Sequence, residues 1–300
     1  MAGGRFEEFF CLALRFTGIP WYLREVYARR KITIINYHNP SPDIFLQHLK
    51  YFSRHYSFVS AHAVARALDW QDFSDLPPKP MLITFDDGYA GNAHLVGAIR
   101  KYHVPAMFYI VAGTAGTKRV FWFEMVRNDP ALLERLKQVP DQKRRALLQK
   151  KTGHTDTREY EIRHCLSIDE LKQLADAGAN IGSHTLFHPM LDKCDEKTGK
   201  RECVEARKRL EKILEIPVEH FALPGGRGAR VCRQWVKQAG YRTCRTIAPG
   251  WVTQASDPFS LPNFGIDDKA GPHKAAIQAC GLWEMLKKVF RKKPAAVDQN

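Results

Sequence analysis

The sequence predicts an α/β protein in which short apolar strands alternate with amphipathic helices around a mostly parallel sheet. The clearest strands are the apolar runs 81–85 and 106–111, and a helical stretch at about 92–102 separates them. A strand, a helix and a second strand in this order form a βαβ unit, in which the two strands run in parallel. This pattern leaves open whether the sheet is open or closed into a barrel.

The same alternation continues as far as about residue 270. Further strands are expected at 31–37, 58–60, 181–184, 221–223, 243–247 and 261–266, and further helices at 45–56, 61–70, 202–214 and 231–239. Ser167 and Glu170 have the spacing of a capping box, so another helix is expected to begin there and to end near Gly178.

Three segments do not follow this alternation of strands and helices. Residues 114–165 include a charged helical stretch and predict an insertion over one end of the core, either as a solvated helix hairpin or as part of a substrate cleft. Residues 1–30 predict an N-terminal helical segment, and residues 271–300 a basic amphipathic helix and tail. The domain proper is therefore expected to span residues 31–270.

Composition limits the class of protein. The chain has 300 residues, of which 44% are hydrophobic and 26% charged, as in soluble globular proteins. Its net charge of +14 favours a polyanionic partner, an anionic membrane surface or an acidic substrate. The basic residues are dispersed and no aromatic-basic platform stands out, so nucleic acid is not expected as a partner.

Several features bear on location. The seven cysteines have irregular spacing, which favours free thiols in a reducing compartment over a disulfide framework. Glu7 and Glu8 precede the first apolar stretch and Arg15 interrupts it, so this stretch is a poor secretory signal. No apolar run reaches the roughly 18 residues that a membrane span requires. We therefore expect a cytoplasmic protein, with peripheral association at the inner face of the membrane as a further option.

Two amphipathic segments could provide that association. Residues 5–30 are rich in aromatic side chains, and they either pack on the domain or lie in a membrane interface. In residues 281–293, one helical face carries Leu282, Met285, Leu286 and Val289, and five cations lie in the last two turns. This helix either packs on the domain or anchors the protein to anionic lipid, where each cation contributes about 1 kcal/mol.

The most informative stretch is 83–89, in which two adjacent carboxylates, Asp86 and Asp87, directly follow a buried strand. Gly88 supplies the bend that the chain needs there, because glycine adopts positive φ without steric cost. Carboxylates at the end of a core strand are costly to desolvate unless a cation or a proton holds them. Taken alone, the motif is better explained as a strand-to-loop turn with solvated acids.

A second motif changes this assessment. His184 and His188 follow another apolar strand end. Together with Asp87 they provide two imidazoles and one carboxylate with one position left open, which is the donor set of a catalytic zinc site. Co²⁺, Ni²⁺ or Fe²⁺ fit the same ligands, so the metal is expected to be divalent, with Zn²⁺ as the first choice.

At this point the sequence resembles a known family. Residues 84–89 (Thr-Phe-Asp-Asp-Gly-Tyr) resemble the first motif of the polysaccharide deacetylases, the NodB-homology or carbohydrate esterase 4 family. Residues 184–188 resemble its second motif, and residues 221–226 occupy the place of its third. The match covers roughly residues 31–270. It implies a distorted (β/α)7-type barrel with a helical insertion.

The resemblance also implies roles for individual residues. Asp87, His184 and His188 would hold the metal, and Asp86 would be the general base that takes a proton from water. The backbone N–H of Gly225 would stabilise the developing oxyanion. The implied reaction is hydrolysis of an N-acyl group, expected to be acetyl, on an amino sugar.

The sequence departs from the family pattern in its third motif. Most members have Arg-x-Pro there, with the arginine holding the base, whereas this chain has Ala222-Leu223-Pro224. Another cation would then have to orient Asp86, and the candidates are Arg227 and Arg245.

The family's last motif normally supplies a histidine that protonates the leaving amine, and none lies near residues 261–268. His273 is a weak replacement. His38 is a better one, because one branch, resembling the biofilm poly-N-acetylglucosamine deacetylases, places its acid histidine at the end of the first strand. Alternatively, His38 is a structural residue at the end of the strand and is hydrogen-bonded to the backbone. Asp267 and Asp268 loosely resemble a family position that supports the site.

The expected function is therefore a metal-dependent hydrolase that removes an N-acyl group from an amino sugar in a polysaccharide or a lipid-linked glycan precursor. A cytoplasmic location favours a precursor used in cell envelope biosynthesis. The alternative is a catalytically inactive glycan- or glycolipid-binding protein that keeps the fold. The missing arginine favours this alternative, whereas the intact Asp-Asp and His-x-x-x-His motifs favour the enzyme.

Overall fold

A computed structural model of the chain describes residues 2–226 and 228–290. It contains one sheet whose strands follow the order β7-β6-β5-β4-β3-β1-β8, while β2 pairs with β3, and all of these pairings are parallel. The strands are β1 (Thr33–Tyr37), β2 (Ser57–Phe58), β3 (Pro80–Phe85), β4 (Met107–Ile110), β5 (Asn180–Ser183), β6 (His220–Ala222), β7 (Thr243–Arg245) and β8 (Phe264–Gly265). Each predicted strand is present, although the last is shorter than the expected 261–266.

The sheet curls into a distorted (β/α) barrel, as the family resemblance implies. The segment that contains β8 spans the gap between the two edges of the sheet. Leu261 pairs in parallel with Arg245 at the end of β7, and Phe264 pairs with Ile35 of β1. The strands at both edges therefore have a neighbour, which removes most of the unpaired backbone that an open edge would expose.

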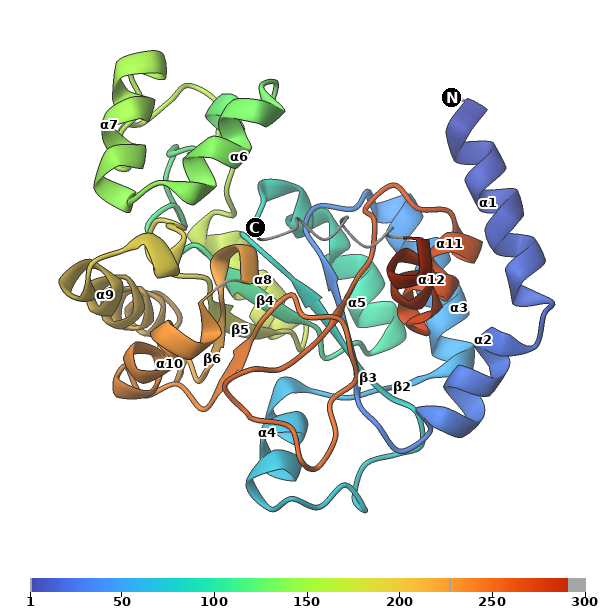
Figure 1. The fold of residues 1–300 in the computed structure, drawn as a ribbon. Helices are drawn as coiled ribbons and strands as arrows, with labels where there is room; N and C mark the ends of the chain where they lie inside the picture. Colours follow the sequence, from blue (N-terminus) through green and yellow to red (C-terminus); the bar gives the residue numbers. More distant parts are fainter. Residues whose placement is uncertain (1, 227, 291–300) are drawn as a thin grey trace, which may run out of the picture.

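Helices cover the outside of the barrel (Figure 1). They are α1 (Ala2–Arg15), α2 (Ile19–Tyr22), η1 (Leu23–Tyr27), α3 (Pro42–His55), α4 (Ala61–Asp69), η2 (Ala90–Leu95), α5 (Val96–Tyr102), η3 (Glu124–Val126), α6 (Pro130–Gln138), α7 (Asp141–Thr152), α8 (Ile168–Asp176), η4 (Leu191–Lys193), α9 (Glu196–Leu214), η5 (Pro224–Gly226), α10 (Ala229–Gln238), α11 (Pro272–Ala279) and α12 (Leu282–Phe290). The capping box of Ser167 and Glu170 begins α8 as predicted. Helix α9 begins before the predicted residue 202, because Asp195 caps it by accepting a hydrogen bond from the Thr198 N–H at 2.8 Å.

The central strands are buried along their whole length. All residues of β1, β3 and β4 are buried, as expected for parallel strands with a packed layer on both faces. Phe85 at the end of β3 stacks on Phe108 of β4 with ring centroids 4.5 Å apart, and Tyr37 at the end of β1 stacks on Phe85 at 5.5 Å. These rings fix the strand ends from which the polar motifs emerge.

The insertion forms a lobe on one side of the barrel, made chiefly of α6 and α7 (Figure 1). Its small core contains Trp122, on which the guanidinium of Arg144 stacks at 4.7 Å. Arg144 is itself paired with Asp141 at 2.6 Å. The Trp122 indole N–H donates to the carbonyl of His188 at 2.8 Å. The lobe is thus bonded directly to the loop that follows β5.

The two ends of the described chain pack together. Cys11 of α1, Leu23 of η1 and Leu282 of α12 belong to one apolar cluster, and residues from α11 complete it. The carboxylate of Glu8 accepts hydrogen bonds from the backbone N–H groups of His273 and Lys274, at 2.7 and 3.1 Å. An acidic side chain from α1 therefore caps the first turn of α11, whose own N-cap glycine offers no side chain.

This packing revises the expectation for the C-terminal helix. Leu282 is buried and Leu286 is partly buried against the cluster, whereas Met285 and Val289 are 38% and 76% exposed. Half of the apolar face therefore serves the fold, as in the packed alternative. Three of the five expected cations, at 291–293, lie outside the described residues.

Within residues 2–226 and 228–290, no helix combines the length and the apolar character needed to cross a bilayer. The seven cysteines all lie in this part of the chain, and all are free thiols, as predicted.

Candidate active site

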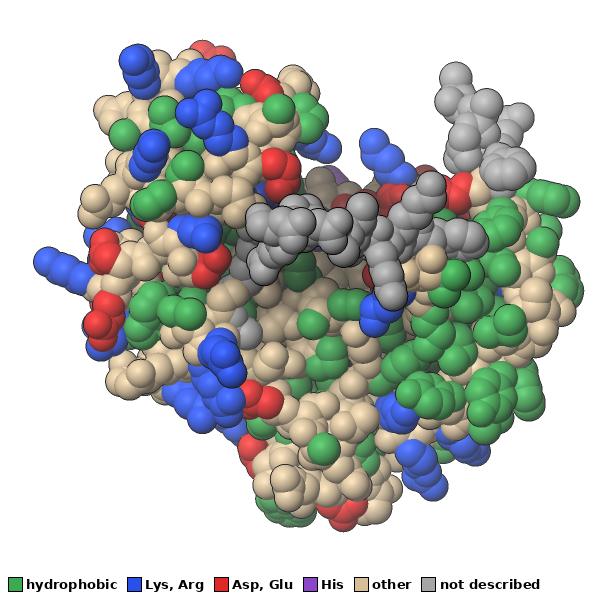
Figure 2. All heavy atoms as spheres, in the orientation of Figure 1, with side chains coloured by type: hydrophobic (Ala, Val, Ile, Leu, Met, Phe, Trp, Pro, Cys, Tyr) green, Lys and Arg blue, Asp and Glu red, His purple; other side chains and the backbone are tan. Residues whose placement is uncertain are grey.

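The predicted site residues meet at the carboxyl-terminal ends of the strands. His38 follows β1, Asp86 and Asp87 follow β3, and His184 and His188 follow β5. All five line one cavity of about 420 Å³. Figure 2 shows the molecule hollowed between the α6–α7 lobe and the main body. Strand ends at this edge of a parallel barrel are where such folds place their functional groups.

Asp87, His184 and His188 form a compact group of three ligands. The Oδ1 atom of Asp87 lies 3.6 Å from Nε2 of His184 and 3.4 Å from Nε2 of His188. Ligands bound tetrahedrally to zinc at about 2.0–2.1 Å stand roughly 3.3 Å apart. The spacing of the three atoms therefore fits a single ion between them.

The protonation of these groups agrees with metal binding. Burial lowers the pKa of His184 to about 4 and lowers that of His188 well below its usual value, so both rings are neutral at physiological pH. Nδ1 of His184 lies 2.8 Å from the carbonyl of Ala222, so Nδ1 carries the proton and the lone pair of Nε2 faces Asp87. Oδ1 of Asp87 is buried and has no hydrogen-bond partner among the described residues. Two neutral imidazole rings and a buried carboxylate oxygen without a partner suit a cation.

The backbone around the ligands is strained. Asp87, Thr185 and His188 have φ values of 70°, 69° and 57°, a region that residues other than glycine rarely adopt. Gly88 follows with φ 82°, and a Cβ atom there would lie 2.9 Å from the Ile110 side chain. Strain of this kind persists only where the surrounding structure imposes it, and it gathers at functional sites.

Asp86 has an environment of its own. Nη2 of Arg245 lies 2.5 Å from both of its carboxylate oxygens, and the Asn36 side-chain amide donates to Oδ2 at 3.1 Å. Burial alone would raise the pKa of Asp86, but the charge of Arg245, with smaller contributions from His184 and His38, lowers it to about 2. Burial raises the pKa of the neighbouring Asp87 to about 7. Adjacent carboxyl groups with such different environments suit different tasks.

Arg245 is the cation that the third motif lacks. It ends β7, is 1% exposed, and also donates to the Thr246 carbonyl at 3.1 Å. In the sheet, three strands separate β7 from β3, so this arginine reaches Asp86 only because the barrel curls. The sequence suggested Arg245 and Arg227 alike; Arg227 lies outside the described residues.

His38 stands at the rim of the cavity. Its side chain is exposed and lines the same cavity as the metal ligands. The Asp268 carboxylate accepts hydrogen bonds from the backbone N–H groups of His38 and Asn39, at 3.0 and 2.9 Å. Asp268 thereby fixes the backbone that carries His38 and leaves the imidazole free to meet a ligand.

Three other predicted residues are placed as follows. Gly225 lines the cavity with φ 58°, and its role toward an oxyanion stays a prediction. Asp267 pairs with Lys274 at 2.8 Å. His273 lies 2.7 Å from a guanidinium nitrogen of Arg15, and neither it nor Asp267 lines the cavity.

The insertion supplies one wall of the cavity. Trp122, Phe123, Glu124 and residues of α6 line it, and the ring of Phe123 packs edge-on against His188 with centroids 4.8 Å apart. Tyr89 donates to Glu124 at 2.7 Å across the mouth. Residues of the 114–165 insertion therefore line the cavity, and their contact with a substrate stays a prediction. The sequence did not predict site roles for Asn36, Tyr89 or this aromatic wall. The three consecutive aromatic residues 121–123 were the signal that could have indicated the wall.

A second group of potential ligands, His62, Glu219 and His220, lies elsewhere. His220 begins β6 and so stands at the opposite end of the barrel. The Arg242 guanidinium lies 3.3 Å from the Glu219 carboxylate and already neutralises it. This group therefore offers a cation much less than the buried triad does.

Comparison with known proteins agrees with this geometry. Residues 74–244 match the polysaccharide deacetylase family. The putative polysaccharide deacetylase YxkH of Bacillus subtilis is 20% identical over 184 residues, which are 61% of this chain and 50% of YxkH. The chain thus spans about half the length of this curated relative.

Solved structures show the same fold. The Streptococcus pyogenes deacetylase PplD, in complex with acetate, has a TM-score of 0.62 at 20% identity, covering 83% of this chain and 98% of that one. IcaB from Ammonifex degensii has a TM-score of 0.59 at 18% identity, covering 83% and 97%. The family match spans more than half of the sequence, and the chain belongs to the polysaccharide deacetylase family.

We predict that the triad binds one divalent ion. Replacing His184 with Ala removes one of three ligands, so the purified variant should lose most of its bound metal, as measured by elemental analysis after dialysis. His94→Ala, at an exposed histidine outside the cavity, is the control and should keep its metal. A His184→Ala protein with full occupancy would contradict the assignment.

Proposed function

We propose that this protein is a metal-dependent hydrolase that removes the N-acetyl group from an amino sugar in a glycan. The observation that supports this most directly is the pairing of two unlike carboxyl groups: Asp87 faces His184 and His188, while Asp86 is held by Arg245. A base separate from the ligands is what hydrolysis of an amide needs, because one group binds the cation while the other remains free to accept a proton.

The residues divide the work as follows. A divalent ion at the triad, zinc by its donor set, would polarise the acyl carbonyl and make water more acidic. Asp86, ionised and oriented by Arg245 and Asn36, accepts the proton of the attacking water. His38, which lines the same cavity, donates a proton to the leaving amine. The backbone at Gly225 faces the developing oxyanion.

The position of Arg245 argues against the inactive alternative. A catalytically dead binding protein would have no need of a buried ion pair on the base, because burying two charges costs several kcal/mol for each ion unless their geometry recovers it. This chain lacks the usual arginine of the third motif but brings one from β7 to the same carboxylate. The arginine that is missing from the third motif is thus replaced by one from another strand.

Asp86→Asn is expected to keep its metal and to lose activity on an acetylated amino-sugar oligomer by a factor of about 10² or more, because the amide cannot act as a base. Metal content and acetate release from the same preparation test this. Asp169→Asn, at an exposed position on α8, is the control for loss of a carboxylate. Unchanged acetate release by Asp86→Asn would remove Asp86 from the mechanism.

His38→Ala is expected to slow hydrolysis of an amide far more than hydrolysis of an activated aryl ester, because a good leaving group departs without a proton. The ratio of the two kcat/KM losses is the readout. A general acid contributes about 10²–10⁴-fold, and that loss should appear on the amide alone. Equal losses on both substrates would assign His38 to binding.

We further propose that the substrate is a lipid-linked glycan precursor of the cell envelope, met at an anionic membrane surface. The N-terminal helices expose a continuous group of large apolar side chains, visible as the green area around α1 and α2 in Figure 2. They are Phe9, Phe10, Phe16, Ile19, Trp21, Tyr22, Val26 and Tyr27, with exposed fractions from 41% to 84%. Arg29 is half-exposed close by, and Lys31 lies 3.3 Å from the centre of the Tyr27 ring.

Aromatic rings beside cations are typical of segments that lie in the headgroup region of an anionic bilayer. This surface, and not the C-terminal helix alone, carries the membrane proposal, because Leu282 and Leu286 of α12 pack inward. It also accounts for part of the net charge of +14.

Co-sedimentation with vesicles tests the membrane proposal. The protein should sediment with anionic vesicles at low salt and much less with neutral ones, because each cation near the surface contributes about 1 kcal/mol. Trp21→Ser should weaken this binding, whereas Trp70→Ser, at an even more exposed tryptophan just after α4, should not. Identical behaviour of the two variants, or no binding by the wild type, would refute the proposal.

A further inference from the structure

A second, larger cavity lies on the other side of the metal-binding loop. His184 and His188 line the catalytic cavity, but Leu186 and Phe187 between them line this one, whose volume is about 700 Å³. The two cavities share no residue. The rest of its wall comes from the loop after β4, from α7 and residues 155–157 that follow it, and from α9.

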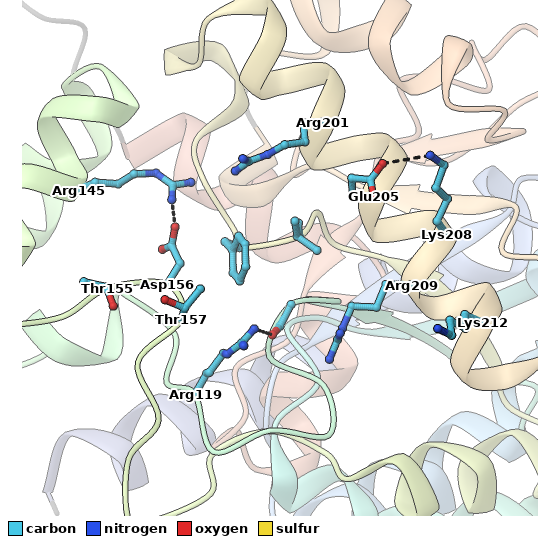
Figure 3. Close-up of a pocket in the computed structure, with 13 residues that line it drawn as sticks. Arg119, Arg145, Thr155, Asp156, Thr157, Arg201, Glu205, Lys208, Arg209 and Lys212 are labelled. Carbon is cyan, nitrogen blue, oxygen red and sulfur yellow. Dashed lines mark hydrogen bonds and ion pairs between the residues drawn. The ribbon is translucent and has the colours of Figure 1, made fainter.

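The wall of this cavity is strongly basic (Figure 3). Six cationic side chains line it: Arg119, Arg145, Arg201, Lys208, Arg209 and Lys212. Only Asp156 and Glu205 oppose them in the lining, which leaves an excess of four positive charges. Four of the cations lie on α9 at spacings of seven, one and three residues, so one face of this helix points toward the cavity.

Part of this charge is neutralised locally. Lys208 pairs with Glu205 at 3.1 Å, Arg119 with Glu159 at 3.3 Å, and Arg145 with Asp141 at 2.6 Å. Arg145 also pairs with Asp156, and one of its guanidinium nitrogens lies 3.5 Å from the buried Glu202.

Three cations form no ion pair with an acidic side chain among the described residues, although the charge of Arg201 acts on the buried Glu202. Arg201 and Lys212 make no hydrogen bond or ion pair with the part of the chain that the structure describes, and Arg209 bonds only to carbonyl oxygens. The pKa of Arg209 is lowered, first by burial and then by the charge of Arg119, so two guanidinium groups crowd each other here. Such crowding costs free energy until an anion relieves it.

The donors are also held in place before any ligand arrives. Arg209 donates to the carbonyls of Ala112 and Ala115 at 2.7 and 3.2 Å, and Arg119 donates to the carbonyl of Gly113 at 2.8 Å. Figure 3 shows these two side chains reaching into the same space from the loop and from α9. Each guanidinium retains further N–H groups, so an anion would meet fixed donors and little side-chain entropy would be lost.

We propose that this basic cavity binds a phosphate-type anion, such as a phosphate, a diphosphate or the phosphorylated end of a glycan. Arginine forks match the geometry of phosphate oxygens, and several unpaired cations suit a ligand of more than one negative charge better than a single carboxylate. The exposed hydroxyl groups of Thr155 and Thr157 add neutral donors at the rim.

A ligand in this cavity would contact the outer face of the metal-binding loop. Oε2 of Glu202 accepts the backbone N–H groups of Leu186 and Phe187 at 2.9 and 2.8 Å, and the neighbouring Arg201 lines the cavity. Binding of an anion to this cavity can nevertheless be measured without turnover. The test of this proposal therefore does not depend on the proposed catalytic activity.

Calorimetric titration of the full chain with inorganic pyrophosphate, inorganic phosphate and a sugar 1-phosphate tests the proposal. Pyrophosphate should bind, and its affinity should fall as salt is raised. The double variant Arg201→Gln with Lys212→Gln should bind it about tenfold or more weakly, because two charge-assisted contacts are lost. Tighter binding of the sugar phosphate than of phosphate would identify a phosphorylated glycan; the reverse would identify a free phosphate or diphosphate.

The matched control is Lys50→Gln with Lys101→Gln, which removes two positive charges at exposed positions on α3 and α5, outside the cavity. It should keep wild-type affinity within about twofold, since distant surface charges are screened. Equal weakening in both double variants would reduce the effect to net charge and overturn the proposal. So would unchanged pyrophosphate binding in the cavity variant, because the anion would then be bound elsewhere, for example at the metal ligands.

Discussion

The buried ion pair between Asp86 and Arg245 is the interaction on which the site depends. Both side chains are almost fully buried, and each charge would cost several kcal/mol to bury without the other. Their contact joins the ends of β3 and β7, which only a curled sheet brings together. The pair keeps Asp86 ionised beside Asp87, whose pKa burial raises to about 7. The carboxyl groups of two adjacent residues in one turn therefore have very different pKa values.

The loop that carries His184 and His188, the proposed metal ligands, is held from two sides. The Trp122 indole bonds the carbonyl of His188 from the insertion, and the Glu202 carboxylate of α9 bonds the loop backbone at Leu186 and Phe187. These contacts support a backbone with positive φ at Thr185 and His188. They also make the loop a shared wall, with the catalytic cavity on one side and the basic cavity on the other.

Much of the fold could be predicted from the sequence, because the signals that define strands and helices are local. Apolar runs such as 81–85 and 106–111 marked buried strands, and the capping box at Ser167 marked the start of α8. The two polar motifs followed such strands, so their approach at one edge of the sheet followed from parallel pairing. The donor types of Asp87, His184 and His188 then indicated a metal site before any distance was known.

The sequence by itself thus determined the helices and strands, the strands after which the polar motifs lie, and the three residues proposed as metal ligands. Only the tertiary structure decided that Arg245, and not a residue beside Pro224, pairs with Asp86, that Asn36 also bonds Asp86, and that Trp122 and Phe123 line the cavity. It also decided which part of the α12 apolar face is buried. The physical reason is that periodicity records how much of a side chain is buried, whereas the partner it meets depends on how the barrel closes and where the insertion folds back.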